Sequence, residues 1–205
     1  MGKVLPVNST NALRTISHDP RIHGDGFLQL DLKNGSRLHI WGDPRIPERP
    51  NTAHIHDHRF DLISHILLGE LRNLSYNAVP DDNGLVHIYR IKRINNGTTE
   101  KQGPPYEMPV LEDSQRYKLL AIDDKYIEQG ENYFHPHGVL HETQPQKLSV
   151  SVVTKPFVSE SWVPRVVCRI NEGIDNTFSR YCLPEEVLWE IIEDTMKEVF
   201  SHGSP

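Results

Sequence analysis

The sequence predicts an all-β fold with one α-helix near its C-terminus. Two observations carry this prediction across the 205 residues. Apolar and polar residues alternate from Phe27 onward, and several short runs rich in β-branched residues follow along the chain. By contrast, a helical stripe of apolar residues is convincing only in the last segment, residues 184–200. A chain of this length is expected to form one domain.

The first strands are predicted over residues 27–41, FLQLDLKNGSRLHIW. Leu28, Leu30 and Leu32 alternate with polar residues, and the alternation resumes after the Asn34-Gly35 pair. Asn-Gly suits the positive φ angles of a type I′ turn, so the segment is expected to be a β-hairpin with this two-residue turn.

Further strands are expected where short apolar runs are bounded by turn residues. These runs cover residues 62–68, 70–76, 85–93, 117–122, 147–157 and 165–170. The polar segment at 95–109 is expected to be a long surface loop.

A helix is predicted over PEEVLWEIIEDTMKEVF, residues 184–200. Pro184 suits a first helical turn, and the two following glutamates suit the positive end of the helix dipole. An apolar stripe is formed by Leu188, Ile191, Ile192, Met196 and Val199. We expect this stripe to pack on the sheet.

Charge and composition narrow the range of partners that the protein is expected to bind. The chain holds 22 basic and 28 acidic residues, a net charge of −6, and no run of Lys or Arg. We therefore expect no nucleic-acid partner, since phosphate binding needs a basic surface. No apolar segment has the length of a signal peptide or a membrane span, so we expect a cytoplasmic protein that does not associate with membranes. We expect its partner to be a small-molecule substrate.

Histidines gather in the stretch NTAHIHDHRF, residues 51–60. His54, His56 and His58 stand at alternate positions, and alternate residues of a strand face the same side. Two imidazoles at this spacing can therefore converge on one metal ion. A second histidine stretch, GENYFHPHGVLHE at 130–142, suggests that both contribute to a single site.

The second stretch resembles the second motif of the cupins, Gly-x5-Pro-x-Gly-x2-His-x3-Asn. Gly130, Pro136, Gly138 and His141 fall at the required spacing, whereas Pro145 stands in the position of the Asn. The resemblance implies a small β-barrel in which this turn aims His141 inward at the ion.

The first cupin motif, Gly-x5-His-x-His-x3,4-Glu-x6-Gly, is matched in two registers. With His56 and His58 the closing glycine is Gly69, but Leu62 stands at the acidic position and Pro50 at the first glycine. With His54 and His56 the acid becomes Asp61 and the closing glycine is lost. We prefer His56, His58 and His141 as ligands, with His54 and Asp61 as candidate additional ligands.

A site of three histidines without a carboxylate is similar to that of the thiol dioxygenases, the cupins that include cysteine dioxygenase. The resemblance covers 27–157 and implies a jelly-roll barrel, with 1–26 as an N-terminal extension and 158–205 as a C-terminal strand and helix of the same domain. The family's Ser, His and Tyr trio would fall on Ser149, Ser151 and Val153, and its substrate-binding arginine near residues 27–30, where no basic residue stands. These departures make cysteine itself a doubtful substrate.

The resemblance implies an Fe(II)-dependent, dioxygenase-like oxidoreductase. His65 and His137 are candidate acid–base groups, because imidazole titrates near neutral pH; the role of His135 is left open. Two alternatives stand beside this one: a Zn or Ni cupin acting as a hydrolase or isomerase, and a metal-free binding cupin. The segments outside the barrel offer a strand and a helix for a homodimer.

Overall fold

The computed structural model describes residues 9–48, 53–94, 106–112, 114–172, 174 and 180–202. Within these ranges it contains two helices and thirteen strands. In chain order they are α1 (Ser9–Ile16), β1 (Arg21–His23), β2 (Phe27–Asp31), β3 (Arg37–Trp41), β4 (Ile55–His56), β5 (Phe60–Leu68), β6 (Glu70–Pro80), β7 (Val86–Ile94), β8 (Tyr106–Leu111), β9 (Tyr117–Glu128), β10 (Asn132–His135), β11 (Leu140–Pro145), β12 (Ser149–Val158), β13 (Arg165–Arg169) and α2 (Glu185–His202).

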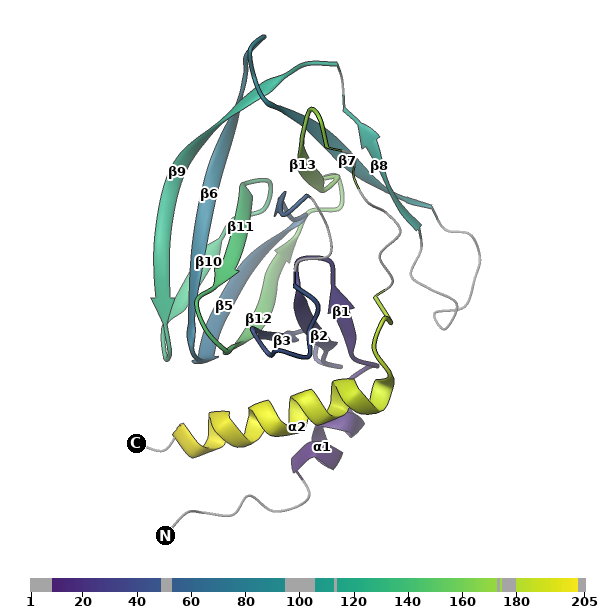
Figure 1. Cartoon of the computed structure of the whole chain (residues 1–205), viewed down its shortest axis with the longest axis vertical. Coiled ribbons are helices and arrows are strands. Elements are labelled where there is room, and N and C mark those ends of the chain that lie inside the picture. The colour runs from purple at the N-terminus through teal and green to yellow at the C-terminus, as the bar shows by residue number, and fades with distance from the viewer. Residues whose placement is uncertain are drawn as a thin grey trace.

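The strands form two antiparallel sheets that enclose a barrel interior (Figure 1). One sheet has the order β1-β2-β3-β12-β5-β10, and the other has the order β13-β4-β11-β6-β9-β7-β8. Strands that are distant in sequence therefore become neighbours, as β3 and β12 do in the first sheet. This arrangement is a jelly roll, or double-stranded β-helix, with a C-terminal helix packed against it, as the sequence predicts.

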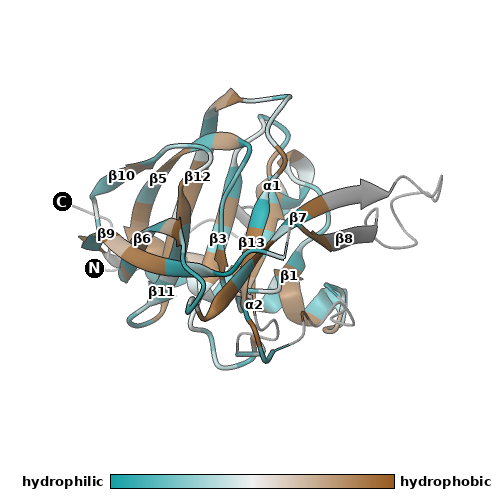
Figure 2. Ribbon diagram, turned by 90° about the horizontal axis from the view of Figure 1, so that it is seen from above, coloured by the Kyte–Doolittle hydropathy of each residue, from teal (hydrophilic) through white to brown (hydrophobic). Residues whose placement is uncertain are grey.

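The six-stranded sheet has two different buried faces. Leu28 and Leu30 of β2, with Leu38 and Ile40 of β3, pack together with residues of α2 in the largest hydrophobic cluster. The alternate residues of both strands face the barrel interior, where Phe27 and Trp41 belong to a second cluster. Apolar and polar residues accordingly follow one another along the strands in Figure 2.

The predicted helix is confirmed as α2, which lies along the end of the barrel beside α1 (Figure 1). Ile191 and Ile192 are fully buried and Leu188 nearly so, hence the stripe packs on the sheet as expected. The guanidinium of Arg14 in α1 lies 4.3 Å from the ring centre of Trp189 and holds the two helices together. Neither described helix is long and apolar enough to cross a membrane.

Two local predictions need correction. The hairpin turn is not a two-residue type I′ turn, because Asp31 pairs with Arg37 and the closing hydrogen bond runs from Leu32 N to Ser36 O. The loop has three residues and ends at Gly35, whose φ of +86° suits the last position of such loops. The predicted surface loop at 95–109 is also shorter than expected, since β8 begins at Tyr106; residues 95–105 lie outside the described residues.

Candidate metal centre

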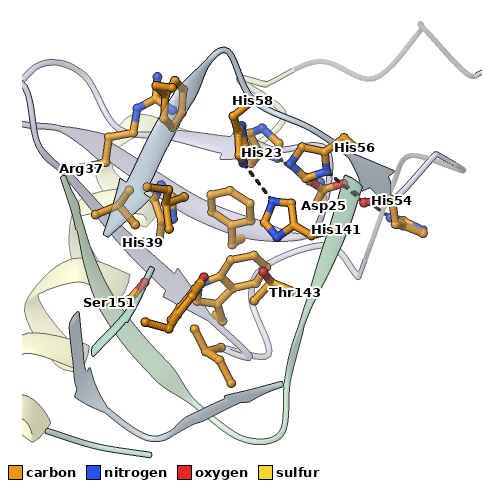
Figure 3. Close-up of a pocket in the computed structure, with 17 residues that line it drawn as sticks. His23, Asp25, Arg37, His39, His54, His56, His58, His141, Thr143 and Ser151 are labelled. Carbon is orange, nitrogen blue, oxygen red and sulfur yellow. Dashed lines mark hydrogen bonds and ion pairs between the residues drawn. The ribbon is translucent and has the colours of Figure 1, made fainter. Parts of the chain in front are cut away.

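His56, His58 and His141 come together at one end of the barrel interior (Figure 3). β4 pairs with β11 so that His56 and His141 are direct cross-strand partners. One ligand nitrogen from each of the three rings lies within 4.8 Å of the others, and Nε2 of His58 is 3.0 Å from Nε2 of His141. The fold thus joins the two histidine stretches into one cluster.

Hydrogen bonds fix which nitrogen two of these rings present. Nδ1 of His56 lies 2.9 Å from the carbonyl oxygen of His54, and Nδ1 of His141 lies 2.8 Å from Oδ1 of Asn73. Because both partners are acceptors, each Nδ1 carries the proton and donates it. In the neutral form of each ring, Nε2 is left with a lone pair that can bind an ion.

The cluster fits a divalent transition metal. Two ligands at right angles on an ion, with bonds of about 2.1 Å, stand about 3.0 Å apart, which is the separation found between His58 and His141. Burial, reinforced by neighbouring imidazoles, holds the pKa of both rings well below its ordinary value. Both rings are therefore neutral near pH 7, the form that binds a metal.

Two further residues support the cluster from outside. The ring of His135 stacks on that of His141 with centres 3.9 Å apart, and its Nε2 bonds to the carbonyl of Val139. The carboxylate of Asp25 lies 3.7 Å from Nδ1 of His56. Although burial raises the pKa of Asp25, the nearby His56 and His23 outweigh this effect and hold it well below its usual range. An ionised carboxylate here favours a cation in the cluster.

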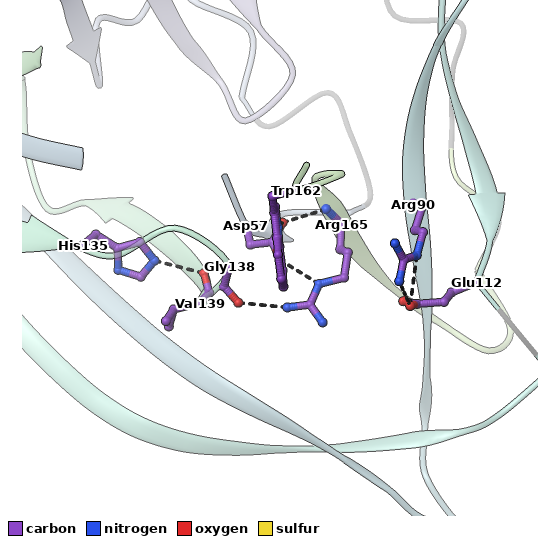
Figure 4. A network of polar contacts seen from close by, with 8 residues as sticks. All are labelled: Asp57, Arg90, Glu112, His135, Gly138, Val139, Trp162 and Arg165. Atoms are coloured by element: carbon purple, nitrogen blue, oxygen red, sulfur yellow. Dashed lines mark hydrogen bonds and ion pairs between the residues drawn. The ribbon is translucent and has the colours of Figure 1, made fainter. Parts of the chain in front are cut away.

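Asp57, the acid within the HIHDH stretch, faces away from the cluster. Its buried carboxylate accepts hydrogen bonds from the backbone N and the Nε of Arg165, both at 2.7 Å, and from Trp162 Nε1 at 3.3 Å (Figure 4). Arg165 also donates to the carbonyl of Gly138 at 2.8 Å. Asp57 therefore anchors the segment that carries His56 and His58 to β13 and to the turn before His141.

Gly138 is the residue of that turn on which the geometry depends most. Its backbone N donates to the carbonyl of His58 at 3.0 Å, which joins the two histidine stretches directly. Its φ is +71°, and a Cβ at this position would lie 2.9 Å from the ring of Trp162. Glycine is required here both for the backbone conformation and for the close approach.

A pocket with a volume of about 50 Å³ lies beside the cluster. Aromatic and apolar side chains line much of it. Its lining residues are His23, Asp25, Phe27, Arg37, His39, Trp41, His54, His56, His58, Phe60, Leu62, Leu71, Tyr133, His141, Thr143, Ser151 and Val153. The three histidines form part of the pocket wall, so a small molecule that enters the pocket lies next to them.

The other candidate residues lie in different places. His54 lines the pocket, with Nδ1 3.6 Å from a carboxylate oxygen of Asp25. Asp61 accepts hydrogen bonds from the backbone N and Nδ1 of His137, at 2.9 and 2.8 Å, so these two residues are hydrogen-bonded to each other. His65 bonds to Asn132 Oδ1. Asp61, His65 and His137 are not among the described residues that line the pocket.

Several residues at the site were not predicted from the sequence. Asn73 lies on β6 and Asp25 in the turn between β1 and β2, whereas Arg37 and His39 lie on β3. Asn73 carries no sequence signal, because its role depends on the pairing of β6 with β11. The HGDG stretch at 23–26 is a usable signal, since it places a histidine and an acid around turn glycines close to the barrel.

Neither protein-family models nor curated proteins match the sequence. Solved structures resemble the chain only distantly. Hydroxypropylphosphonic acid epoxidase from S. wedmorenis is 11% identical over 67% of this chain and 55% of that chain, with a TM-score of 0.34. Hydroquinone 1,2-dioxygenase from Sphingomonas sp. TTNP3 is 10% identical over 66% and 64%, with a TM-score of 0.30. The ribosomal oxygenase YcfD from Escherichia coli is 11% identical over 100% and 60%, with a TM-score of 0.33.

This chain spans less than two thirds of the length of those three proteins. All three are named as oxygen-using or epoxidising enzymes, but likenesses this distant do not carry an argument about activity. The case for a metal centre therefore rests on the geometry of the three histidines.

Proposed function

We propose that the chain is a metal-dependent cupin oxidoreductase in which His56, His58 and His141 hold Fe(II) and a small molecule reacts with O₂ in the adjoining pocket. The observation that carries the proposal is the cluster of three imidazoles that together line the wall of one pocket. Three protein ligands leave coordination positions open, and an Fe(II) ion with open positions can activate O₂ beside a bound substrate.

The chain's own residues would prepare this reaction in three ways. Asn73 and the carbonyl of His54 orient the ligand rings. Asp25 supplies negative charge next to His56. Phe27, Trp41 and Tyr133 line the pocket with apolar surface, which limits water around the substrate. His65 and His137 have no role at the ion in this proposal, and we further propose that the protein acts without a nucleic-acid partner.

Metal analysis is the first test. Protein without an affinity tag should be purified anaerobically as wild type, as the His56→Ala/His141→Ala double variant and as the His18→Ala control, since His18 is exposed. We expect near-stoichiometric iron in the wild type and the control, and loss of iron in the double variant. Zinc or nickel in place of iron, lost in the same variant, would favour a hydrolase or isomerase. Absence of metal from all three proteins would contradict the metal-dependent proposal and favour a metal-free barrel that binds a small molecule.

Open coordination positions are the second test. Nitric oxide, a stable stand-in for O₂, should bind the Fe(II)-loaded wild type and give an electron paramagnetic resonance signal. O₂ uptake during a screen of small molecules then identifies a substrate. Failure of nitric oxide to bind the iron-loaded protein would contradict the oxygenase proposal.

A further inference from the structure

β3 presents a row of polar side chains to the pocket. Arg37, His39 and Trp41 stand at alternate positions and all line the pocket, while Leu38 and Ile40 between them pack in the cluster with α2. In Figure 3, Arg37 and His39 lie across the pocket from His56 and His141. The pocket therefore has a histidine cluster at one end and a second polar region at the other.

Two buried polar atoms of this row have no partner in the described part of the chain. Nε2 of His39 and Nε1 of Trp41 lack hydrogen bonds, although the two residues are only 8% and 5% exposed. Buried polar groups in folded proteins are nearly always hydrogen-bonded. Two unsatisfied atoms on neighbouring positions of one pocket wall indicate a place for a ligand that carries polar atoms.

The same end of the pocket carries a surplus of positive charge. Arg37 Nε donates to Asp31 Oδ1 at 3.0 Å, but the same carboxylate also pairs with Arg21. Two guanidinium groups therefore share one acid. Among the described residues no other acid pairs with Arg37.

Lys155, on the neighbouring strand β12, adds to this charge from beside Phe60, although it is not itself among the described residues that line the pocket. Its Nζ and the guanidinium carbon of Arg37 each lie 5.6 Å from the ring centre of Phe60, which lines the pocket. Burial lowers the pKa of Lys155, and the charge of Arg37 lowers it further. No described acid forms an ion pair with Lys155, so an anion between Lys155 and Arg37 would relieve their repulsion.

We propose that the pocket selects an anionic small molecule. Its carboxylate, phosphonate or phosphate group binds at Arg37 and Lys155, and polar atoms of the molecule bond to Nε2 of His39 and Nε1 of Trp41. The far end of such a molecule reaches toward His58 and His141. The assignment of that end as the reacting end rests on the proposed function. Binding of the anion rests on β3 and β12 alone and can be measured without a metal.

The test measures binding of benzoate, phenylphosphonate and hexanoate, each beside a neutral counterpart: benzamide, benzyl alcohol or hexanamide. Ligand-observed NMR and calorimetry should be run on metal-free protein and on Zn(II)-loaded protein. The variants are Arg37→Gln, Arg37→Lys and Lys155→Gln. The matched control is Arg72→Gln, because Arg72 is also a strand arginine paired with one aspartate, Asp124, and does not line the pocket.

We expect at least one acid to bind the metal-free wild type at least tenfold more tightly than its neutral counterpart. Arg37→Gln should remove this preference, Arg37→Lys should retain part of it, and Arg72→Gln should leave it unchanged. If Arg37→Gln does not fold, Lys155→Gln must weaken acid binding severalfold. Carboxylates and phosphonates are told apart by which acid binds best.

Equal affinity for acids and neutral counterparts would overturn the proposal, as would an acid preference that survives in Arg37→Gln. An acid preference found only in the Zn(II)-loaded protein would also overturn it, because the anion would then be binding the metal. Acid binding to metal-free protein that fails to take up iron would uphold this inference and contradict the proposed function, so the two can fail separately.

Discussion

Asn73 determines which nitrogen of His141 faces the cluster. Its Oδ1 accepts a hydrogen bond from Nδ1 of His141 at 2.8 Å, and the side chain is only 4% exposed. Without this acceptor the ring could place its proton on Nε2, the nitrogen nearest His58. The orientation of a metal ligand is thus set by a residue that does not itself reach the ion.

We expect Asn73→Leu to weaken metal binding by about 10- to 100-fold, because leucine has a similar volume but cannot accept the hydrogen bond from Nδ1 of His141. The measurement is competitive titration of Zn(II) or Co(II) into metal-free protein. Asn77→Leu, on the exposed part of the same strand, is the control and should bind as the wild type does. Unchanged affinity in Asn73→Leu would show that His141 needs no fixed partner.

Asp57 is the second residue whose effect can be measured. Its carboxylate is fully buried and pairs with Arg165. Asp57→Asn leaves this guanidinium without its counter-charge, so we expect a loss of about 3 kcal/mol in the free energy of unfolding. Urea denaturation measures the change, and Asp82→Asn, at an exposed turn position, should change stability by less than about 0.5 kcal/mol. A loss in Asp57→Asn as small as that would contradict the anchoring role.

At the scale of elements, the strands β2 and β3 depart from the usual pattern of a half-buried sheet. Their apolar faces meet α2 on the outside of the barrel, while the opposite faces point into the pocket. The helix therefore acts as an external cover that allows the interior of the barrel to carry polar groups such as His39 and Arg37. Removing the packing of α2 should loosen this wall.

Ile191→Ala tests this packing, because Ile191 is fully buried in the cluster between α2 and the sheet. We expect the free energy of unfolding to fall by about 2–5 kcal/mol, from the lost apolar contact and the cavity left behind. Glu190→Ala, one residue earlier and exposed, should change stability by less than about 0.5 kcal/mol. Equal small effects in the two variants, measured by urea denaturation, would mean that α2 contributes little to the barrel.

At the scale of the whole molecule, folding buries His39 and thereby favours the neutral form of its ring. Burial, aided by Arg37, holds the pKa of His39 well below 6.5. In the unfolded chain the same ring titrates near its ordinary pKa. Between pH 6.5 and the lowered folded pKa, the unfolded state therefore binds more protons, and stability falls as the pH decreases.

We expect the free energy of unfolding of metal-free protein to decrease below pH 6.5, with His39 contributing up to about 1.4 kcal/mol per pH unit. His39→Gln removes this titration and should make the dependence on pH shallower by that amount. Denaturation curves at several pH values between 5 and 7.5 measure both slopes. Parallel slopes in the wild type and the variant would show that His39 does not resist protonation in the folded state.

The sequence by itself determined the all-β class, the C-terminal helix and the two histidine stretches. Periodicity within one strand or helix, and the spacing of residues such as Gly138 and His141, are local properties. The sequence did not determine the type of turn that follows Leu32, since a single Asn-Gly pair is compatible with more than one loop length.

The tertiary structure decided how the site is assembled. Cross-strand pairing placed His56 opposite His141, brought Asn73 behind it, and turned Asp57 and Asp61 toward Arg165 and His137. It also decided that the polar face of β3 points inward, because α2 covers the apolar face. Alternation shows that a strand has two faces, but which face lines the pocket depends on what packs against the other one.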